Sequence, residues 1–507
     1  MKTADLPETV AELKQLVLSL AEENKLLKER LYGRKSEKRS REEETQARLF
    51  NEAEANQGDD QKINQEKPPE KTKVNSYERN KPGRKKLPQD LPRKEIIHDL
   101  PEEEKQCACG HRMSQIGSVK TEKLTIIPEQ AIVETHIRYK YACRHCEGAS
   151  DETRGAVKIA PAPPSLIPKS IATPGLLAYI ITRKYVDGIP LYRLEKIFER
   201  IGIDLSRAAM CNWVIKLQSR LNRLVKLLFS ETRDGPLVGI DETIVQVLNE
   251  AGKSAISKSY MWVARLVKGE KKAVFFRYRP TRKAAFTKRL LRNYRGVVQT
   301  DDFTGYKYLD DENNIIHAGC WAHVRRKFFD LLKSSSKGKI ANIGLNIIGK
   351  LYAIEAIARE ENLSPAELSK LRKEKSTPIV AEFKAFLDEK ATKTPPKSPL
   401  GKAVFYAVNN WPKLLRFLDN GEIPIDNNLV ENAIRPFVIG RKNWLFSDTA
   451  KGARASATLY TLIESAKLNG QEPYWYLRAV FEKLPESKTD KDLLKLMPWN
   501  LKIQPVN

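Results

Sequence analysis

The sequence predicts a multidomain α+β protein that combines a coiled coil, a small metal-binding unit, a helical region and an α/β domain with a helical insertion. Three observations support this prediction: a heptad repeat at the start of the chain, two close pairs of cysteines, and alternating strand and helix patterns after Pro236. The chain has 507 residues, which is too long for one hydrophobic core, since a domain takes roughly 100–200 residues.

The composition is strongly basic. The chain has 89 Lys and Arg against 64 Asp and Glu, a formal net charge of +25, which indicates an anionic partner such as a nucleic acid or an anionic membrane surface. With 41% hydrophobic and 30% charged residues, wholesale disorder and a collagen-like or membrane-protein class are excluded. No run of about 18 apolar residues and no signal-peptide pattern occurs, so we expect a cytoplasmic protein without a membrane partner.

A heptad repeat in residues 1–38 predicts a coiled coil that dimerises the protein. The two core positions hold Leu6, Leu13, Leu20 and Leu27, and Val10, Val17, Asn24 and Leu31. An asparagine at one core position is typical of a parallel dimer in register. An amphipathic surface helix is the alternative interpretation of the same spacing.

Residues 39–95 are predicted to be a charged linker, because a stretch rich in Glu, Lys, Gln and Asn buries too little apolar surface to fold. Within it, residues 81–86 have the sequence KPGRKK, a basic run held extended by proline that suits a DNA minor groove. A solvated basic tail explains this short run equally well.

Two cysteine pairs in residues 96–165 predict a structural zinc site. The pairs are Cys107 with Cys109, and Cys143 with Cys146. Two close pairs of soft ligands close a tetrahedral Zn²⁺ site, and the β-like patches at 123–127 and 132–141 suggest a hairpin between them. The second pair has the usual spacing, but the first is one residue tighter, so His111 is an alternative ligand. Incidental thiols are the alternative to a metal site.

Residues 166–232 have helical spacing and predict a helix-turn-helix-like, DNA-binding region. A helix over 191–198 leads to Gly202, and Ser206 then opens a second helix. The second helix of this motif can enter the major groove, so the candidates for DNA contact are Arg207, Asn212 and Lys216. A helical bundle without a role in DNA binding has nearly the same spacing.

Residues 233–334 and 421–465 predict an α/β domain. Strand patterns at 237–240, 260–267 and 273–278 precede a basic helix at 281–293, strands at 296–300 and 315–318, and a helix at 321–332. This order matches a ribonuclease H-like layer. The residues between the two segments, 335–420, predict a helical insertion, and residues 466–507 form a C-terminal tail.

Three acidic residues of this domain predict a catalytic two-metal site. The first and fourth strands are expected to be parallel neighbours, so Asp241 and Asp301 at their ends meet at one edge of the sheet. Glu431, the third expected ligand, projects from the first turn or two of a helix that the Asp-Asn-Asn run at 426–428 caps. Such carboxylates hold two divalent cations, Mg²⁺ or Mn²⁺, about 3.5–4 Å apart for in-line displacement at phosphorus. Each aspartate alone is more often a turn or cap residue.

Cations lie near these acids in the sequence. Those expected to grip a phosphate backbone beside the metals are Arg435, Arg441 and Lys442, with Lys451 and Arg454 close by. The stretch from Arg265 to Arg295 holds twelve Lys or Arg and one acid, with aromatic residues interleaved. Part of it is a solvated helix face, but a duplex-binding groove explains so unequal a balance better.

Motifs along nearly the whole chain point to one known family. They are LYGRKSEK, the cysteine pairs, KYVDGIPLYRLEKIFERIGIDLSRAAMCNWV, GIDET, QTDDFTGY, GCWAHVRRKF, DNNLVENAIRPFVIGRKNWLFSDTAKGA, EPYWYLRAVFEKLP and MPWN. With these motifs the chain resembles the DDE transposases of bacterial insertion sequences, specifically the large transposase subunit of the insertion sequence 66 family. Together the motifs are too specific for a chance match.

The resemblance implies catalytic acids at Asp241, Asp301 and Glu431, the positions that the strand order also gives. It implies a zinc-binding region at the four cysteines, DNA-binding parts ahead of the catalytic domain, and small companion proteins from the same element. Cys320 and His323 match a Cys-x-x-His element of the family. Its spacing fits zinc, but because no second pair is adjacent we expect it to pack and position residues near the active site.

The chain departs from the family pattern at three places. Asn432 stands where the family has Arg after its glutamate, Asp302 stands where it has Gly after its second aspartate, and the first cysteine pair is narrower. Neither substitution removes a ligand. The two substitutions bear on the efficiency of catalysis. Because Asp302 adjoins Asp301, the identity of the second catalytic acid stays open between these two aspartates.

The sequence therefore predicts a cytoplasmic DNA transposase. It is expected to bind the terminal inverted repeats of its element, form a homodimer or higher oligomer, cut the ends hydrolytically and join the 3′-hydroxyls to target DNA. A divalent-metal nuclease of the same fold is one alternative, but such an enzyme would not need the coiled coil, the zinc unit and the helix-turn-helix that precede the catalytic domain. A decayed transposase that acts as a DNA-binding regulator is another, but all three acids are present.

Overall fold

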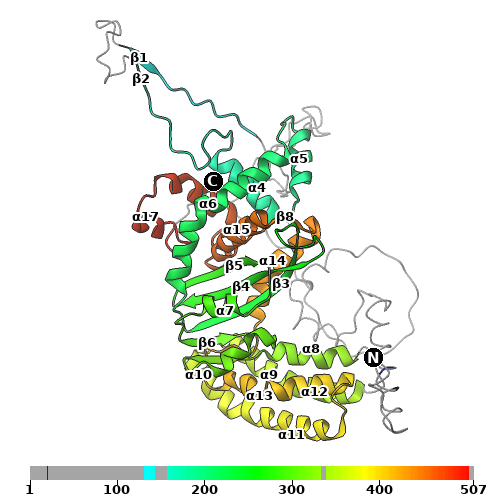
Figure 1. Ribbon diagram of the computed structural model, residues 1–507. Helices are drawn as coiled ribbons and strands as arrows, with labels where there is room; N and C mark the ends of the chain where they lie inside the picture. The colour runs from blue at the N-terminus through cyan, green and yellow to red at the C-terminus, as the bar shows by residue number, and fades with distance from the viewer. Residues whose placement is uncertain (1–16, 18–19, 21–130, 143–156, 333–337, 502–507) are drawn as a thin grey trace, which may run out of the picture. The chain divides into compact units, whose positions relative to one another are not determined.

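The computed structural model describes residues 17, 20, 131–142, 157–332 and 338–501 (Figure 1). The predicted coiled coil, apart from Val17 and Leu20, lies outside the described residues, as do the linker with its basic run, the four cysteines of the predicted zinc site and His111. The chain divides into two compact units, residues 53–162 and the remainder. Each unit is described by itself.

In the smaller unit the described residues include one pair of short strands. Strand β1 (Lys140–Ala142) pairs antiparallel with β2 (Val157–Ile159). The apolar patch at 132–141 contributes a strand only at its end, and β1 pairs with residues that follow the second cysteine pair, whereas the other predicted strand patch, at 123–127, lies outside the described residues. The hydrogen bond from the Ala160 amide to the Tyr139 carbonyl extends the ladder by one step (3.1 Å).

The larger unit is built around a mixed sheet with the strand order β5-β4-β3-β6-β7. Strands β5, β4 and β3 are antiparallel to one another, whereas β3, β6 and β7 are parallel. The strands are β3 (Leu237–Asn249), β4 (Lys258–Lys268), β5 (Lys271–Arg279), β6 (Gly296–Gln299) and β7 (Ile315–Ala318), and β8 (Ser447–Thr449) pairs with the end of β3. The expectation that the first and fourth predicted strands of this domain are parallel neighbours is confirmed.

Strand β3 is longer than the sequence predicted. We expected it to end before Asp241, but it continues to Asn249, because its ladder with β4 runs without interruption from Leu237 to Gln246. Asp241 therefore lies inside a strand. The basic helix expected at 281–293 is also shorter: α7 (Ala285–Leu290) has 6 residues, and the chain turns at Asn293, whose φ of 63° is incompatible with a continuing helix.

In the described part of this unit from residue 163 onward, three helices precede the sheet. They are α4 (Pro174–Tyr185), α5 (Leu191–Arg200) and α6 (Arg207–Thr232). The chain turns between α5 and α6 at Gly202, whose φ of 80° favours glycine, and the Ser206 hydroxyl caps α6 by accepting a hydrogen bond from the Ala209 amide. The predicted helix, glycine turn and serine-capped second helix are thus confirmed.

The sheet is covered by helices from the end of the chain. Helix α15 (Ala450–Leu468) runs along the edge strand β5, where the Thr461 and Ser465 hydroxyls accept hydrogen bonds from the Phe276 and Val274 amides at 2.9 and 3.0 Å. These hydroxyls thereby accept hydrogen bonds from backbone N–H groups that the edge strand would otherwise leave unpaired. Helix α14 (Asn428–Trp444) packs on β3. After α15 come α16 (Pro473–Lys483), a 3₁₀ turn (Leu484–Glu486) and α17 (Asp490–Leu494).

A layer of helices adjoins the β6–β7 side of the sheet (Figure 1). A 3₁₀ helix (Thr304–Asp311) precedes β7, and the layer itself comprises α8 (Trp321–Leu332), α9 (Gly338–Glu360), α10 (Pro365–Leu371), a π-helical turn (Arg372–Ser376), α11 (Thr377–Lys393), α12 (Pro399–Asn409), α13 (Trp411–Leu414) and a 3₁₀ turn (Leu415–Leu418). The stretch expected to be mostly helical is helical.

Two hydrophobic clusters hold the larger unit together. One runs from Leu166 in the helical region through the sheet to Leu501 in the tail, and the other fills the helical layer around Trp321 and Phe383. Within the described residues one helix, Ile340–Glu360, is long and apolar enough to cross a membrane, but Ile348 and Leu351 of this helix are buried in the second cluster. It is a core element of the layer.

Strand β3 and α14 approach each other closely at Gly239. A methyl group there would overlap Val430 Cγ2 and lie 2.9 Å from Asn427 Oδ1. We predict that Gly239→Ala lowers the free energy of unfolding by about 1–3 kcal/mol, because overpacking must push α14 away from the strand. The matched control is Gly349→Ala in α9, where the added methyl meets nothing within 4 Å and helix propensity favours alanine. Thermal denaturation of both variants checks this, and equal stability of the two would contradict the close approach.

Candidate active site

Part of β3 lacks a partner strand on its β6 side. The β6 ladder ends at Gly239 opposite Gln299, and β8 meets β3 only from Val247 onward. In the described part of the chain, therefore, no strand pairs with residues 240–246 on that side. Asp241 lies at the start of this gap. Asp301 follows the end of β6 by two residues, and Glu431 lies in the first turn of α14, which packs on β3.

The three predicted acids interact electrostatically at this gap. Burial raises the pKa of the Asp241 carboxyl well above its usual range, and the negative charges of Glu242, Asp301 and Glu431 raise it further. A hydrogen bond from the Glu242 amide to Asp241 Oδ1 (2.8 Å) opposes the rise. The structure thus brings the three acids together, close enough for each of the other two to repel a charge on Asp241.

Glu431 has an unsatisfied oxygen. Arg326 of α8 donates to Oε2 at 3.1 Å, but the buried Oε1 has no hydrogen-bond partner. The nearest group recorded is Nδ1 of His323, at 3.6 Å, which is itself buried and without a hydrogen bond. An orphaned carboxylate oxygen among other hard oxygen donors fits a divalent cation, so Asp241, Asp301 and Glu431 are the residues that would hold one.

Cys320 and His323 lie beside Glu431. The ligand atoms of Cys320, His323 and Glu431 lie within 4.8 Å of one another, which also permits a metal ion. Burial raises the pKa of the Cys320 thiol, and Sγ accepts a hydrogen bond from the Asn427 amide at 3.2 Å. This hydrogen bond connects Cys320 to the start of α14.

Asn427 holds α14 against β3. It is the N-cap residue of α14, but its side chain does not cap the helix; Nδ2 instead donates to the Ile240 carbonyl at 3.1 Å. Asp426 satisfies the helix end, because its Oδ1 accepts a hydrogen bond from the Asn428 amide at 3.1 Å. Of the Asp-Asn-Asn run that was expected to cap the helix, Asp426 provides the side-chain cap, and the side chain of Asn427 instead joins Glu431's helix to the residue before Asp241.

The two adjacent aspartates after β6 have different surroundings. Asp301 Oδ1 accepts a hydrogen bond from the Phe303 amide (3.0 Å), and the charge of Asp301 acts on Asp241. Asp302 Oδ1 lies 4.0 Å from Lys413 Nζ of α13. Asp301 is therefore the aspartate that belongs to the acid cluster, while Asn432, the other departure, has an exposed side chain.

Cations on α14 extend away from the acids. Arg441 donates from Nη1 to the Thr243 hydroxyl of β3 at 3.2 Å, and burial lowers its pKa. Lys442 is exposed and Arg435 is half-buried. These residues follow Glu431 along the same helix, and Arg441 contacts β3 two residues beyond Asp241.

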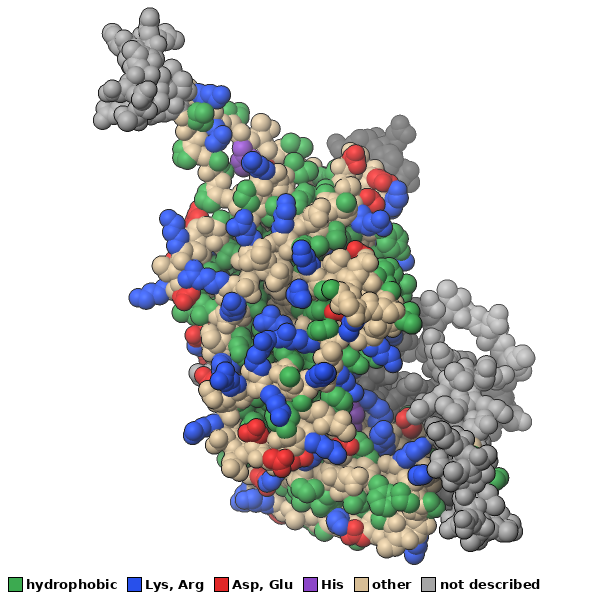
Figure 2. Space-filling model, viewed as in Figure 1, with side chains coloured by type: hydrophobic (Ala, Val, Ile, Leu, Met, Phe, Trp, Pro, Cys, Tyr) green, Lys and Arg blue, Asp and Glu red, His purple; other side chains and the backbone are tan. Residues whose placement is uncertain are grey.

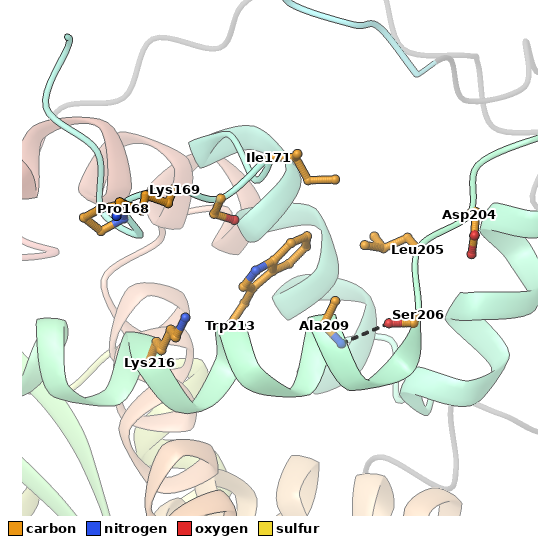
Figure 3. Close-up of a pocket in the computed structure, with 10 residues that line it drawn as sticks. Pro168, Lys169, Ile171, Asp204, Leu205, Ser206, Ala209, Trp213 and Lys216 are labelled. Atoms are coloured by element: carbon orange, nitrogen blue, oxygen red, sulfur yellow. Dashed lines mark hydrogen bonds between the residues drawn. The ribbon is translucent and has the colours of Figure 1, made fainter.

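The candidates for DNA contact on α6 are all exposed, but they do not share one face. Asn212 and Lys216 are one turn apart and lie on the same side of α6, whereas Arg207 is about two and a half turns from Lys216 and projects from the opposite side. Lys216 lines an open pocket of about 410 Å³ with Trp213, Lys169 and Ile171 (Figure 3). The start of α6 at Ser206 forms its other end.

Three residues of the site were not found from the sequence: Glu242, Arg282 and Tyr306. Glu242 forms an ion pair with Arg282 and accepts a hydrogen bond from the Tyr306 hydroxyl (2.5 Å). Burial raises the pKa of Glu242, and its contacts with Tyr306 and Arg282 oppose that rise. The alternation of Val245 and Val247 would have shown that β3 continues past Asp241, and hence that Glu242 points away from Asp241 across the strand.

Comparisons with known proteins agree with the motifs. Family models match residues 169–455 ("Transposase IS66 family"), 461–499 ("IS66 C-terminal element"), 104–147 ("zinc-finger binding domain of transposase IS66") and 19–96 ("Transposase C of IS166 homeodomain"). Uncharacterized protein y4jD of Sinorhizobium fredii is 31% identical over 100% of this chain and 99% of its own length. Uncharacterized protein y4qI of the same organism is 34% identical over 79% of this chain and 74% of its own. No solved structure matches the chain.

The raised pKa of Asp241 predicts a pH-dependent stability in divalent-free buffer. An acid whose pKa is higher in the folded than in the unfolded protein stabilises the fold at low pH, and this stability is lost as the pH rises through the folded pKa. Asp241→Asn should therefore raise the melting temperature more at pH 8 than at pH 5, by about 2–4 °C for each kcal/mol of repulsion relieved.

Adding Mn²⁺ provides the control for this prediction. Mn²⁺ should raise the melting temperature of the unsubstituted protein and remove the advantage of the Asp241→Asn variant at pH 8, because a bound cation relieves the same repulsion. Thermal denaturation at pH 5, 6, 7 and 8 measures both effects. A difference in melting temperature that does not change with pH would contradict the proximity of the acids.

Proposed function

We propose that this chain, which belongs to the IS66 transposase family, is a DNA transposase that binds the terminal inverted repeats of its insertion sequence and catalyses metal-dependent DNA cleavage and strand transfer. The observation that carries the proposal is the meeting of Asp241, Asp301 and Glu431 where the pairing of β3 is interrupted. Carboxylates are hard oxygen ligands of the kind that divalent cations prefer, and one of the three has an oxygen without a hydrogen-bond partner. Metal-ion catalysis of this kind needs no nucleophilic side chain.

The strand order supports a ribonuclease H-like catalytic domain. Three antiparallel strands are followed by two parallel ones, and the acids lie on the first strand, after the fourth and on a later helix. In an open sheet of this kind ligands bind beyond the ends of parallel strands, and the end of β6 beside Asp241 is such a place.

The proposed reaction is an in-line displacement at phosphorus that occurs twice. A water oxygen first attacks the phosphorus at the element end, and the bond to the 3′ oxygen breaks to leave a 3′-hydroxyl. That hydroxyl oxygen then attacks a phosphorus of the target strand, whose own 3′ oxygen leaves. Two Mg²⁺ or Mn²⁺ ions, when bound, activate the attacking oxygen and stabilise the leaving one. The protein's part is to hold the acids, which Asn427 and Arg326 do for Glu431.

Basic side chains would bind the DNA around this site. Figure 2 shows Lys and Arg side chains gathered over the middle of the face on which α7 lies, and the exposed ones on and beside α7 are Lys283, Lys288, Arg289 and Arg292. Together with Arg435, Arg441 and Lys442 of α14 they can contact phosphates without reading sequence. Recognition of the element end is assigned to α6, where Asn212 and Lys216 share a face.

The remaining parts of the proposal concern zinc and assembly. The match of residues 104–147 to a zinc-finger family model supports structural Zn²⁺ at Cys107, Cys109, Cys143 and Cys146. The heptad repeat supports assembly as a dimer or higher oligomer. Membership of the family is the basis for proposing that small companion proteins from the same element take part.

Strand transfer tests the proposed catalysis. With companion proteins present, the unsubstituted chain should join a labelled element end to plasmid DNA in Mg²⁺ or Mn²⁺. Asp301→Asn and Glu431→Gln should each lower joining at least about a hundredfold while end binding survives, because each removes a charge that holds the ions. Asp302→Asn is the matched control and should retain joining. End binding without joining by the unsubstituted protein would point to a DNA-binding regulator, and cleavage without joining to a nuclease.

Gel-shift assays test the recognition helix. Replacing Lys216 by alanine should weaken binding to the element end by about 1–3 kcal/mol if it contacts a base edge, with a smaller loss for unrelated DNA. Arg207→Ala, on the opposite side of α6, is the comparison and should have the smaller effect on sequence preference. Unchanged affinity of the Lys216 and Asn212 variants would remove α6 from the interface.

A further inference from the structure

Arg282 reaches the acid cluster from the opposite face of the sheet. It lies in the segment between β5 and α7 and forms an ion pair with Glu242. Its guanidinium carbon lies 3.6 Å from the centroid of the Phe303 ring, and Nη2 lies 3.9 Å from Asp301 Oδ2. Arg282 therefore occupies the space between a buried glutamate and one of the catalytic acids.

Glu242 is placed to hold Arg282 and is itself inaccessible. The Glu242 side chain is 1% exposed, whereas that of Arg282 is 36% exposed. The Tyr306 hydroxyl takes one oxygen of the Glu242 carboxylate, and Arg282 takes the other through Nε and Nη2. Tyr306 is fully buried and packs edge-on against Trp262 and Phe303. The position of the guanidinium is thus fixed by groups that cannot easily move.

The contacts leave part of the guanidinium available. Glu242 uses the Nε–Nη2 edge, and no protein acceptor is recorded for Nη1 among the described residues. The buried carboxylate of Glu242 needs a cationic partner. That need alone does not explain why Arg282 also lies beside Asp301 and against the Phe303 ring. Arg282 therefore keeps Nη1 without a protein acceptor while its bound Nη2 lies 3.9 Å from Asp301 Oδ2, and this arrangement is suited to an anion carried by the substrate.

We infer that Arg282 binds a non-bridging oxygen of the scissile phosphate, and that Glu242 and Tyr306 are positioning residues that orient it. The inference rests on the proposed function and names the group that contacts the reacting phosphate. In the displacement, negative charge is spread over the non-bridging oxygens while one phosphorus–oxygen bond forms and another breaks. Arg282 donates hydrogen bonds to that charge, and no proton leaves it.

A binding experiment that needs no turnover tests the contact. The full chain binds an element-end duplex in Ca²⁺, with either the natural scissile phosphate or an uncharged methylphosphonate at that position. The methylphosphonate should weaken binding of the unsubstituted protein at least about fivefold, but should not change binding of Arg282→Ala, which has already lost the contact. Glu242→Gln should give an intermediate response, because the arginine is present but less well oriented.

Controls separate this contact from general charge. A methylphosphonate two nucleotides away should weaken DNA binding by the unsubstituted protein and by every variant to the same extent. Arg289→Ala removes an exposed arginine of α7 and should respond to the scissile methylphosphonate as the unsubstituted protein does. Additive effects of Arg282→Ala and the scissile methylphosphonate would overturn the inference. Failure of joining by the unsubstituted protein would instead contradict the proposed function, without altering the binding result.

Turnover and metal binding give a second readout. With precleaved ends, Arg282→Ala should lower kcat for joining about a hundredfold, and Arg282→Lys should recover part of the lost rate. The rise in melting temperature that Mn²⁺ causes should persist in Arg282→Ala. Loss of that Mn²⁺ effect in Arg282→Ala would show that Arg282 acts on the metal-binding carboxylates and not on the phosphate, and would also overturn the inference.

Discussion

One side chain, that of Asn427, fixes the geometry on which the acid cluster depends. Its amide group donates to the Ile240 carbonyl, and its backbone N–H donates to Cys320 Sγ. Three segments far apart in the sequence, β3, the start of α8 and the start of α14, are thereby joined within one residue of Asp241 and four of Glu431. Gly239 makes the arrangement possible, because any larger residue would meet Val430.

Neutral hydrogen bonds hold together groups that repel one another. Asp241, Asp301 and Glu431 converge at the gap in β3, and their mutual repulsion would separate them if they were not anchored on separate segments of the fold. Glu242 is neutralised from one face by Arg282, and Glu431 is approached from the other by Arg326. Both ion pairs lie at the edge of the cluster, so the proposed cations would bind at its centre.

The helical region and the acid-bearing helix are physically connected. The far end of α14 donates from Asn443 Nδ2 to the Gly188 carbonyl between α4 and α5, and Tyr185 of α4 hydrogen-bonds Ser456 of α15 at 3.0 Å. Because α4, α5 and α6 share a hydrophobic cluster with the sheet, the proposed recognition helix is held rigidly relative to the acids. End recognition and positioning of the scissile phosphate would then follow from one orientation of the DNA.

Much of the fold followed from sequence, but the site followed only in part. Parallel pairing of the strands at 237 and 296 and the place of Glu431 on α14 came from hydrophobic pattern, whereas the reason given for Asp241 was wrong: its strand continues, and only its β6 partner ends. Arg282 falls within the basic helix expected at 281–293, since local spacing cannot show that the helix starts four residues later, at Ala285. The role of Asn427 depends on tertiary contact with Ile240 and has no local signal.

The most direct test of this account is the location of Mn²⁺ by anomalous diffraction from the full chain bound to an element end. Two manganese peaks about 3.5–4 Å apart are expected among Asp241, Asp301 and Glu431, with Cys320 and His323 outside the coordination sphere. A single ion held by Cys320, His323 and Glu431, or no ion at the gap in β3, would contradict it.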